Sequence, residues 1–400
     1  MALRGRVRCG MTLPSPSAPS LHAGDALRRA AACLSDGDAV QARAWYAKAA
    51  EVDAGARVEL GRMLVLGIGG AIDLAGAQAQ WLAAESSGHP GASYLLATYP
   101  PGDDLQAQAR LEHAAAAGLP VAQRALALVR ARQDDEGAEA ASVDLLRRAA
   151  ARDPVSALML AARAAVGEGM VRDHSLANHL HQQLAAHGLP PLPPVSPGPP
   201  TALRVLHEHP RVACADGVLS ADECRLLIAL MRPHLRRSQV QAEDREGQHV
   251  NDVRTSSSAT VDRVIEDHAA RRIQQRLAEA AGVPLLQAEA MSILHYAPGQ
   301  QYRPHRDYLP PSALQADQPA SGNRFRTLCV YLNDVESGGE TEFPIAAVTV
   351  PPRAGRVVVF DNLDAQGRPD PDSLHAGLPV QRGEKWLGTL WFRERAYRQV

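Results

Sequence analysis

Two histidines and an aspartate are spaced so that they could bind one metal ion. His305 and Asp307 form an H-x-D pair within YRPHRDYLP. In an extended chain residues i and i+2 project to the same face, so an imidazole and a carboxylate can be neighbouring ligands. A third ligand must come from elsewhere, and His375 stands just before another predicted strand. Taken singly, His305 could be a surface imidazole or a hydrogen-bonded core imidazole, and His375 could be a loop residue ahead of a strand.

The residues that accompany this triad indicate its chemistry. Two histidines and one carboxylate form the ligand set of non-haem iron(II) oxygenases, which leaves coordination positions open for substrate and dioxygen. Lys385 begins the predicted strand KWLGTLWF and supplies a compact cation for the distal carboxylate of a dicarboxylic cosubstrate. Tyr296 and Thr341 supply hydroxyl groups suited to that carboxylate.

Lysine is nearly absent from this chain. Lys and Arg together number 42, but only Lys48 and Lys385 are lysines. A coding bias toward Arg explains the general shortage, and we interpret Lys48 as a solvated charge on a helix. Because Lys and Arg differ where a point charge must fit a confined space, Lys385 is predicted to have a specific role.

The stretch 212–397 resembles the catalytic domain of the prolyl 4-hydroxylases, in the iron(II)/2-oxoglutarate dioxygenase superfamily. The matching segments, in the family's order, are LSADECRLLIALMRPHLRRS, DVRTSS, LHYAPGQQYRPHRDYL, NRFRTLCVYLNDVESGGETEFP and PDPDSLHAGLPVQRGEKWLGTLWFRER. The resemblance implies a double-stranded β-helix with Fe(II) and 2-oxoglutarate inside its mouth, and ascorbate as reductant. It departs from the family at FDNLD, residues 360–364, where an aromatic-rich segment is usual.

The resemblance also implies residue roles. The residues that would bind iron are His305, Asp307 and His375. Those that would contact 2-oxoglutarate are Lys385, as the ion pair of its C5 carboxylate, with Tyr296, Thr341 and Trp391.

Three of the implied residues carry an alternative interpretation or a looser role. Trp391 is similar to a tryptophan near the cosubstrate, or it is an ordinary core residue of its strand. Tyr302 resembles a tyrosine that lines the substrate entrance. Arg254 faces the substrate groove, or it forms a surface salt bridge.

The first half of the chain contains a degenerate repeat. Ala-rich units begin at Trp45, Trp81, Leu111, Leu145 and His181. In each unit a Gly, Pro or Asp break separates two helical stretches, and stacking of such pairs produces a solenoid. The units resemble tetratricopeptide-type repeats, particularly the Sel-one-like class. A helical bundle with chance periodicity is the alternative.

The predicted fold class is multidomain: an all-α helical-repeat solenoid followed by an α+β domain with a double-stranded β-helix (jelly-roll) core. We predict a disordered tail over residues 1–20 and helical repeats over residues 21–188. A Pro-rich linker would follow over residues 189–203, because LPPLPPVSPGPPT cannot continue a helix. The dioxygenase domain would occupy residues 204–400.

Within the second half, the hydrophobic pattern predicts helices over 219–233 and 261–281. A capping box of Ser220 and Glu223 would begin the first of them. The segments that read as strands are AEAMSILHYA, RTLCVYLND, TEFPIAAVTV, GRVVVFDN and KWLGTLWFRE.

Composition limits the class of protein. The formal net charge of −2 argues against a general nucleic-acid or anionic-membrane binder. No apolar stretch approaches the roughly 20 residues of a membrane span. The five cysteines are scattered without a C-x-x-C pair, which favours a reducing, cytoplasmic location.

The leading prediction is therefore an enzyme that uses dioxygen and 2-oxoglutarate to hydroxylate a C–H bond. Its target would be peptidyl proline or another residue of a protein or peptide, with the repeats as a docking module. Neither a nucleic acid nor a membrane is expected as a partner. The alternatives are an adaptor that works through its repeats with a vestigial oxygenase domain, and a hydroxylase of a free amino acid or small metabolite.

Overall fold

The computed structural model describes residues 21–100, 104–238, 240–241, 248–249 and 254–399. The tail predicted for residues 1–20 lies outside these residues. Contacts divide the chain into one unit that ends at Gln123 and a second that begins at Arg124. This division falls within helix α7 (Pro120–Arg130), so the domain boundary at residue 188 stays a prediction.

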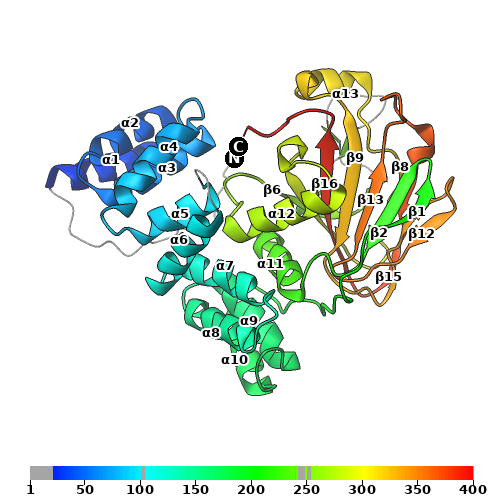
Figure 1. Ribbon diagram of the computed structural model, residues 1–400, viewed down its shortest axis with the longest axis horizontal. Helices are drawn as coiled ribbons and strands as arrows, with labels where there is room; N and C mark the ends of the chain where they lie inside the picture. The colour runs from blue at the N-terminus through cyan, green and yellow to red at the C-terminus, as the bar shows by residue number, and fades with distance from the viewer. Residues whose placement is uncertain (1–20, 101–103, 239, 242–247, 250–253, 400) are drawn as a thin grey trace. The chain divides into compact units, whose positions relative to one another are not determined.

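The first unit consists of paired helices, drawn in blue to cyan in Figure 1. Consecutive helices pack against one another, which agrees with the helical class predicted for this half. The helices are α1 (Leu21–Asp36), α2 (Ala39–Ala49), α3 (Ala54–Leu66), α4 (Leu74–Glu85), α5 (Pro90–Thr98) and α6 (Asp104–Ala116).

The breaks in the repeat pattern act as helix caps. The side chains of Asp38, Asp53 and Asp73 each accept a hydrogen bond from a backbone N–H in the first turn of α2, α3 and α4. Such caps satisfy donors that a helix cannot satisfy internally. Trp81 is fully buried, and Gly61 makes room for it, since a Cβ at Gly61 would lie 2.2 Å from Trp81 Nε1.

In the second unit, helices α8 (Ala138–Ala150), α9 (Pro154–Val166) and α10 (His174–Ala185) precede the sheet domain. Helix α11 (Ala221–Met231) begins with the predicted capping box and packs against α9. Helix α12 (His268–Ala281) begins later than the sequence predicts. Residue Val261 ends strand β6 (Ser257–Val261), and the Asp267 side chain caps α12 by accepting from the backbone N–H of Ala270.

The Pro-rich segment 189–203 is extended and hydrogen-bonded to its neighbours. Arg232 Nη1 donates to the carbonyls of Pro190 and Pro191, at 3.0 and 2.9 Å. The backbone N–H of Ser196 donates to the Asp334 carboxylate at 2.8 Å. This segment therefore lies along the second unit, with its course fixed by specific contacts.

A buried ion-pair network joins α9 to α11. The Asp222 carboxylate accepts from Arg163 Nη2 at 2.7 Å and from Arg225 Nη1 at 3.0 Å. The side chains of Asp222 and Arg163 are 1% and 2% exposed. Arg225 also pairs with Glu168, which follows α9. The last repeat helices and the helix that covers the sheet therefore share a set of desolvated charges.

Replacement of Asp222 by Ala is expected to lower the free energy of unfolding of the second unit by about 3–5 kcal/mol. The change leaves two buried guanidinium groups without their common anion, which costs more than the pair itself contributes. Chemical denaturation measures the loss. The control is Asp144→Ala, which removes an exposed ion pair with Arg148 on α8 and should change stability by at most about 0.5 kcal/mol. Equal effects of the two variants would contradict the prediction.

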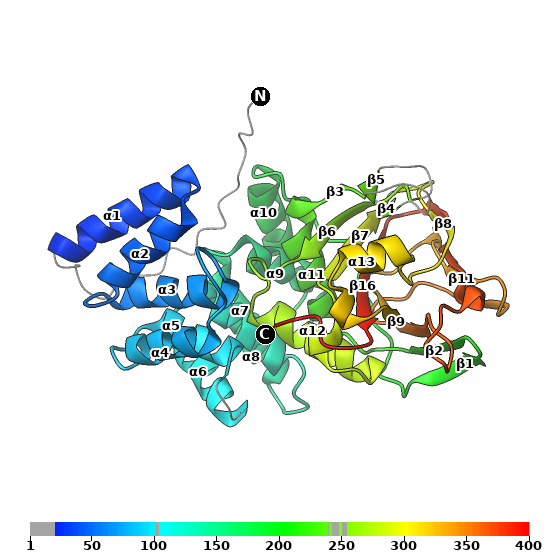
Figure 2. The ribbon, with the colours of Figure 1, turned by 90° about the horizontal axis from the view of Figure 1, so that it is seen from above.

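The second unit contains a large antiparallel sheet of eight strands, and α11 and α12 lie against one face of it (Figures 1 and 2). In spatial order its strands are β1 (Arg204–Glu208), β2 (Arg211–Ala215), β13 (Val357–Asp361), β9 (Arg324–Tyr331), β16 (Lys385–Arg393), β7 (Met291–Tyr296), β6 and β3 (Arg236–Arg237).

A second antiparallel sheet faces the first. Its order is β12 (Val348–Val350), β11 (Thr341–Phe343), β14 (His375–Gly377) and β8 (Tyr302–His305). Two short pairs complete the strands: β10 (Ser337–Gly338) with β15 (Val380–Arg382), and β4 (Val240–Gln241) with β5 (Gln248–His249). Phe343 of the small sheet and Phe360 of the large sheet meet edge to face, with ring centroids 5.0 Å apart. The two-sheet core confirms the predicted fold class.

The predicted strands are present, with one difference. TEFPIAAVTV forms the two strands β11 and β12 rather than one, because the chain reverses at Ala347, whose φ is 52°. Among the helices that the structure describes, none has the length and apolar character needed to cross a membrane.

Candidate active site

The pairing of β8 with β14 brings the three predicted metal ligands together. His305 and His375 are directly opposite each other across these strands. Asp307 follows β8 by two residues. One nitrogen or oxygen atom from each of the three side chains lies within 4.8 Å of the others. Residues far apart in the sequence therefore converge because their strands are neighbours in the small sheet.

The hydrogen bonds of the two imidazoles fix which ring nitrogen is free. His305 Nδ1 lies 2.8 Å from the Arg303 carbonyl, and His375 Nδ1 lies 3.0 Å from the Ser373 carbonyl. A carbonyl only accepts, so each Nδ1 carries the proton and each Nε2 presents a lone pair. Both Nε2 atoms lie 3.6 Å from an oxygen of Asp307. These three groups repel one another unless a cation lies between them, so the donor set fits a metal ion.

The ionisation states agree with metal binding. Burial, with the nearby His375, lowers the pKa of His305 to about 3, which keeps its imidazole neutral. Burial alone would raise the pKa of Asp307. The combined effect of His375, His305, Arg324 and a hydrogen bond from Thr327 outweighs burial, so the pKa of Asp307 is below its usual value. A neutral imidazole and an ionised carboxylate are the forms that bind metals.

Lys385 is a buried cation to which the described residues provide no counter-ion. It is the first residue of β16, directly opposite Tyr296 at the end of β7, and 1% of it is exposed. The rings of Tyr296 and Tyr331 lie 5.2 and 5.3 Å from its Nζ. In the part of the chain that the structure describes, no carboxylate forms an ion pair with it. Burial lowers its pKa from 10.5 to about 8. An anionic ligand would remove the cost of this isolated charge.

The two predicted hydroxyl residues, Tyr296 and Thr341, line the same cavity as Lys385. Burial raises the pKa of Tyr296, while hydrogen bonds with Ser256 and Arg254 oppose that shift. Thr341 Oγ1 lies 2.6 Å from the hydroxyl of Tyr331, which also donates to the Val350 carbonyl. Tyr331, which the sequence analysis missed, is thus in direct contact with a predicted cosubstrate residue.

The remaining predicted residues surround the metal ligands. The Tyr302 ring stacks on the His305 ring, with centroids 3.3 Å apart. The Arg254 guanidinium lies 5.1 Å from the centre of the Tyr302 ring, and Arg254 is buried. Trp391 Nε1 is buried and has no hydrogen-bond partner among the described residues.

All nine predicted site residues line a single cavity between the two sheets. Its walls also contain Leu294, Cys329, Ala376, Gly377, Leu387 and Thr389. The predicted residues are Arg254, Tyr296, Tyr302, His305, Asp307, Thr341, His375, Lys385 and Trp391.

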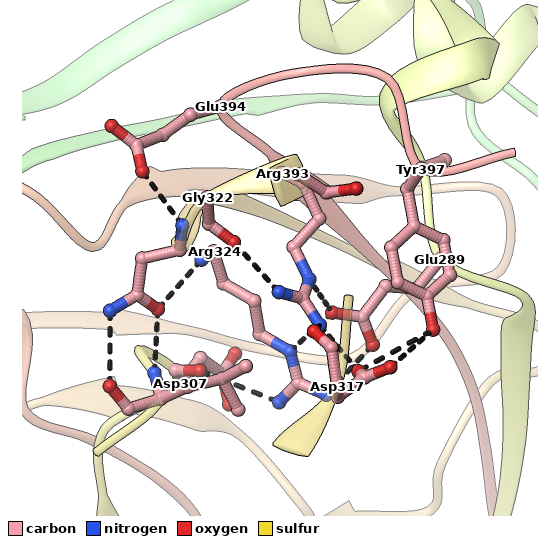
Figure 3. A network of polar contacts seen from close by, with 12 residues as sticks. Glu289, Asp307, Asp317, Gly322, Arg324, Arg393, Glu394 and Tyr397 are labelled. Carbon is pink, nitrogen blue, oxygen red and sulfur yellow. Dashed lines mark hydrogen bonds and ion pairs between the residues drawn. The ribbon is translucent and has the colours of Figure 1, made fainter. Parts of the chain in front are cut away.

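A network of buried charges lies beside this cavity (Figure 3). Glu289 accepts from Arg324 through both oxygens, at 2.7 and 2.8 Å, and from Arg393 at 2.5 Å. Arg393 also bonds Asp317, to which Tyr397 donates. The Arg324 guanidinium lies 4.2 Å from the centre of the Trp391 ring. The network therefore connects Asp317, in the segment that follows Asp307, to strands β9 and β16.

The alternation of β9 could have revealed the residues that the sequence analysis missed. Thr327, Cys329 and Tyr331 are alternate residues of this strand, and Cys329 lines the cavity. Side chains at i and i+2 share a face, so these three point the same way. In the second half of this strand Thr327, Cys329 and Tyr331 alternate with Leu328 and Val330, and such alternation indicates a strand facing a site.

Comparison with known proteins places this site in a family. The 2OG-Fe(II) oxygenase superfamily matches residues 291–393. Probable prolyl 4-hydroxylase 3 of Arabidopsis thaliana is 34% identical in an alignment of 213 residues that covers 48% of this chain and 73% of that protein. Prolyl 4-hydroxylase 1 of the same plant is 35% identical in an alignment of 207 residues that covers 48% of this chain and 72% of that protein. The chain belongs to the prolyl 4-hydroxylase family.

Two solved structures are similar to parts of this hydroxylase-family chain. The viral collagen prolyl hydroxylase of Paramecium Bursaria Chlorella virus-1, in complex with 2-oxoglutarate, is 28% identical with a TM-score of 0.36, over 46% of this chain and 95% of that one. A Sel1 repeat protein from Oxalobacter formigenes is 21% identical with a TM-score of 0.34, over 38% of this chain and 47% of that one.

Membership of this family makes the protein a 2-oxoglutarate- and Fe(II)-dependent dioxygenase. Its cofactor and cosubstrate are therefore Fe(II) and 2-oxoglutarate. The His305, Asp307 and His375 cluster provides nitrogen and oxygen donors suited to Fe(II). The isolated Lys385 ammonium fits a carboxylate group of the cosubstrate.

Proposed function

We propose that this protein hydroxylates a C–H bond of a prolyl residue in a protein or peptide. In this proposal His305, Asp307 and His375 hold the iron, and Lys385 holds the C5 carboxylate of 2-oxoglutarate. The observation that carries the assignment is the presence, in one cavity, of three convergent metal donors and a buried cation that has no counter-ion among the described residues.

The residues of the chain perform distinct tasks in this reaction. Bound Fe(II) and 2-oxoglutarate supply the oxidative decarboxylation that activates dioxygen for attack on carbon. Lys385 fixes one end of the cosubstrate, and the hydroxyl groups of Tyr296 and Thr341 complete the polar surface around that end. Tyr302 and Arg254 flank the metal ligands, where we place the substrate entrance. The apolar walls limit access of water, which limits unproductive turnover.

A macromolecular substrate is favoured by the repeats. Helical repeats extend over about half of the chain, and they would bind a partner and raise the local concentration of its target segment. A free amino acid or small metabolite as substrate is an outcome that the following test can distinguish. We also propose a cytoplasmic location, since the described cysteines Cys33, Cys214, Cys224 and Cys329 are free thiols. Ascorbate is the reductant that we propose for this enzyme.

The direct test is turnover of 2-oxoglutarate to succinate by the purified protein. We expect turnover that requires Fe(II), is sustained by ascorbate and increases with proline-containing peptides. Mass spectrometry should detect a gain of one oxygen atom on proline. His305→Ala should abolish the reaction, and turnover by that variant would contradict the metal assignment. Stimulation by free amino acids alone would contradict the peptide substrate.

The inactive His305→Ala protein also serves to find the substrate. It retains the repeats and most of the cavity, so it should retain partners in a native lysate. Treatment of the captured proteins with active enzyme should then add oxygen to proline in at least one of them. An inactive chain that begins at Arg124, and so lacks the first unit, provides the control for the repeats of that unit. Equal capture of partners by the full-length and the shortened chain would contradict docking through the first unit.

Binding of 2-oxoglutarate is expected to weaken about tenfold for each pH unit above pH 8. Burial lowers the pKa of Lys385 to about 8 in the ligand-free protein, and the carboxylate binds the protonated amine. Below pH 8 the affinity should therefore stay constant. Calorimetry between pH 6.5 and 9.5 with an inert metal in the site measures this dependence, and affinity that is flat through pH 9 would contradict it.

A further inference from the structure

The Asp307 carboxylate accepts a hydrogen bond from the hydroxyl of Thr327. Thr327 Oγ1 lies 2.8 Å from Asp307 Oδ2. Thr327 is fully buried on β9, and Asn362 Nδ2 lies 2.9 Å from its hydroxyl oxygen. Asn362 directly follows β13, where Phe360 is paired with Thr327. The three side chains form a linear series that ends on a proposed metal ligand.

The direction of each hydrogen bond in this series is fixed by chemistry. A carboxylate oxygen only accepts, so the single hydrogen of the Thr327 hydroxyl must point to Asp307. The hydroxyl oxygen can then only accept from Asn362. Asn362 must therefore present its amide nitrogen, and this assigns the orientation of its amide group.

The position of the Asn362 amide is unfavourable for one of its two polar atoms. Its Oδ1 is buried and has no hydrogen-bond partner within the described part of the chain. Asn362 itself is fully buried. An unsatisfied buried acceptor is destabilising, and an apolar residue of similar size would avoid it. Among the described residues, the Asn362 side chain makes one hydrogen bond, and that bond orients Thr327.

We propose that Asn362 and Thr327 are positioning residues that set the orientation of the Asp307 carboxylate for metal binding. This inference rests on the proposed metal role of Asp307. The hydroxyl bond holds Oδ2 and stops rotation of the carboxylate, while both oxygens stay 3.6 Å from an imidazole Nε2. By occupying one oxygen it also opposes chelation through both, which keeps coordination positions open for ligands.

The test is a titration of metal-free protein with Co(II), followed by the visible absorption of the bound ion. Thr327→Val has nearly the same shape but lacks the hydroxyl, and it should bind Co(II) about 10- to 100-fold more weakly, with an altered absorption band. Thr327→Ser restores the hydroxyl and should return the affinity to within about threefold of the wild type. Asn362→Leu should weaken binding in the same direction, while its thermal unfolding midpoint in metal-free form stays at or above that of the wild type.

The matched control is Thr98→Val in helix α5 of the first unit. Thr98 is also buried, but its hydroxyl donates to the Tyr94 carbonyl at 2.9 Å rather than to the carboxylate. Its Co(II) affinity should equal that of the wild type. Wild-type affinity in both Thr327→Val and Asn362→Leu would overturn the positioning role. If Thr327→Val does not fold, Asn362→Leu decides alone. Failure of the wild type to bind Co(II) would instead contradict the proposed metal site.

Discussion

Replacement of Lys385 by Met should weaken 2-oxoglutarate binding by roughly 30- to 4,000-fold. A buried, charge-assisted pair between the ammonium and the C5 carboxylate contributes about 2–5 kcal/mol when one partner is removed, and about 1.4 kcal/mol corresponds to a factor of ten. Met keeps the length of the stem, so the loss comes from the charge. Calorimetry with an inert metal in the site measures the affinity directly.

The same substitution should stabilise the ligand-free protein. Lowering the pKa of Lys385 from 10.5 to about 8 corresponds to an order of 3 kcal/mol at neutral pH, since each pKa unit is about 1.36 kcal/mol. Removal of the charge recovers up to that amount. Gain of stability together with loss of affinity distinguishes a ligand-binding charge from a structural one. A variant that loses both would contradict our assignment of Lys385.

The linkage with pH has a defined sign. The unfolded chain keeps the Lys385 proton up to about pH 10.5, whereas the folded, ligand-free protein loses it near pH 8. Between these values the unfolded state binds more protons, so this group makes stability rise with pH. Over the same interval 2-oxoglutarate binding weakens. In Lys385→Met both dependences should disappear.

Lys385→Arg provides the geometric control. The Lys385 stem passes close to Gly339, where a Cβ would lie 3.2 Å from Cδ of the lysine. The broader, forked guanidinium keeps the charge but does not fit the same place without displacing the ligand. The variant should fold and require much more 2-oxoglutarate. Unchanged affinity would mean that charge alone, and not its compact form, is recognised.

The residues predicted from the sequence come together in one cavity. An H-x-D pair with a distant histidine is a weak pattern in a chain with 15 histidines, so the prediction depended on the residues that accompany it. These are the rare Lys385 and the ordered segments that resemble the prolyl 4-hydroxylases. The register that sets His305 opposite His375 could not be read from the sequence, since it depends on how β8 and β14 pair across the small sheet.

Residues that act through other residues were not predicted. Thr327, Asn362 and Tyr331 have ordinary side chains, and their tasks arise only from contacts between strands that are distant in sequence. The start of α12 was also not predicted. The apolar stripe from Val261 onward is compatible with a helix, but Val261 belongs to β6, which pairs with β7. Tertiary pairing overrides local pattern at that boundary.

Charged residues at the α9–α11 contact also escaped prediction. Arg163 and Asp222 look like solvated helix charges in the sequence, since nothing near them is unusual. Their burial is decided by packing of α9 on α11, and it makes the later repeat helices part of the unit that contains the cavity. The Pro-rich segment predicted as a linker forms hydrogen bonds with Arg232 and Asp334, which attach it along the second unit.

Replacement of Asp307 by Ala is expected to reduce metal affinity by more than 100-fold and to abolish turnover. The carboxylate is the only anionic donor in the three-residue cluster, and each of its oxygens lies 3.6 Å from an imidazole Nε2. Loss of a direct ligand should exceed the 10- to 100-fold effect typical of outer hydrogen-bond partners. Co(II) titration and succinate formation measure the two effects, and affinity within tenfold of the wild type would contradict the assignment.

The space that Asp307→Ala creates permits a stricter test of the same assignment. Formate offers a carboxylate of the removed size, and the Thr327 hydroxyl remains in place to bind one of its oxygens. Added formate should therefore restore part of the Co(II) affinity, whereas formamide, which is neutral, should not. Thr327→Val in the same background should reduce this recovery, because the anion would then lose its positioning bond. Equal recovery with formate and formamide would show that the missing group acts by filling space, and the metal role of Asp307 would have to be abandoned.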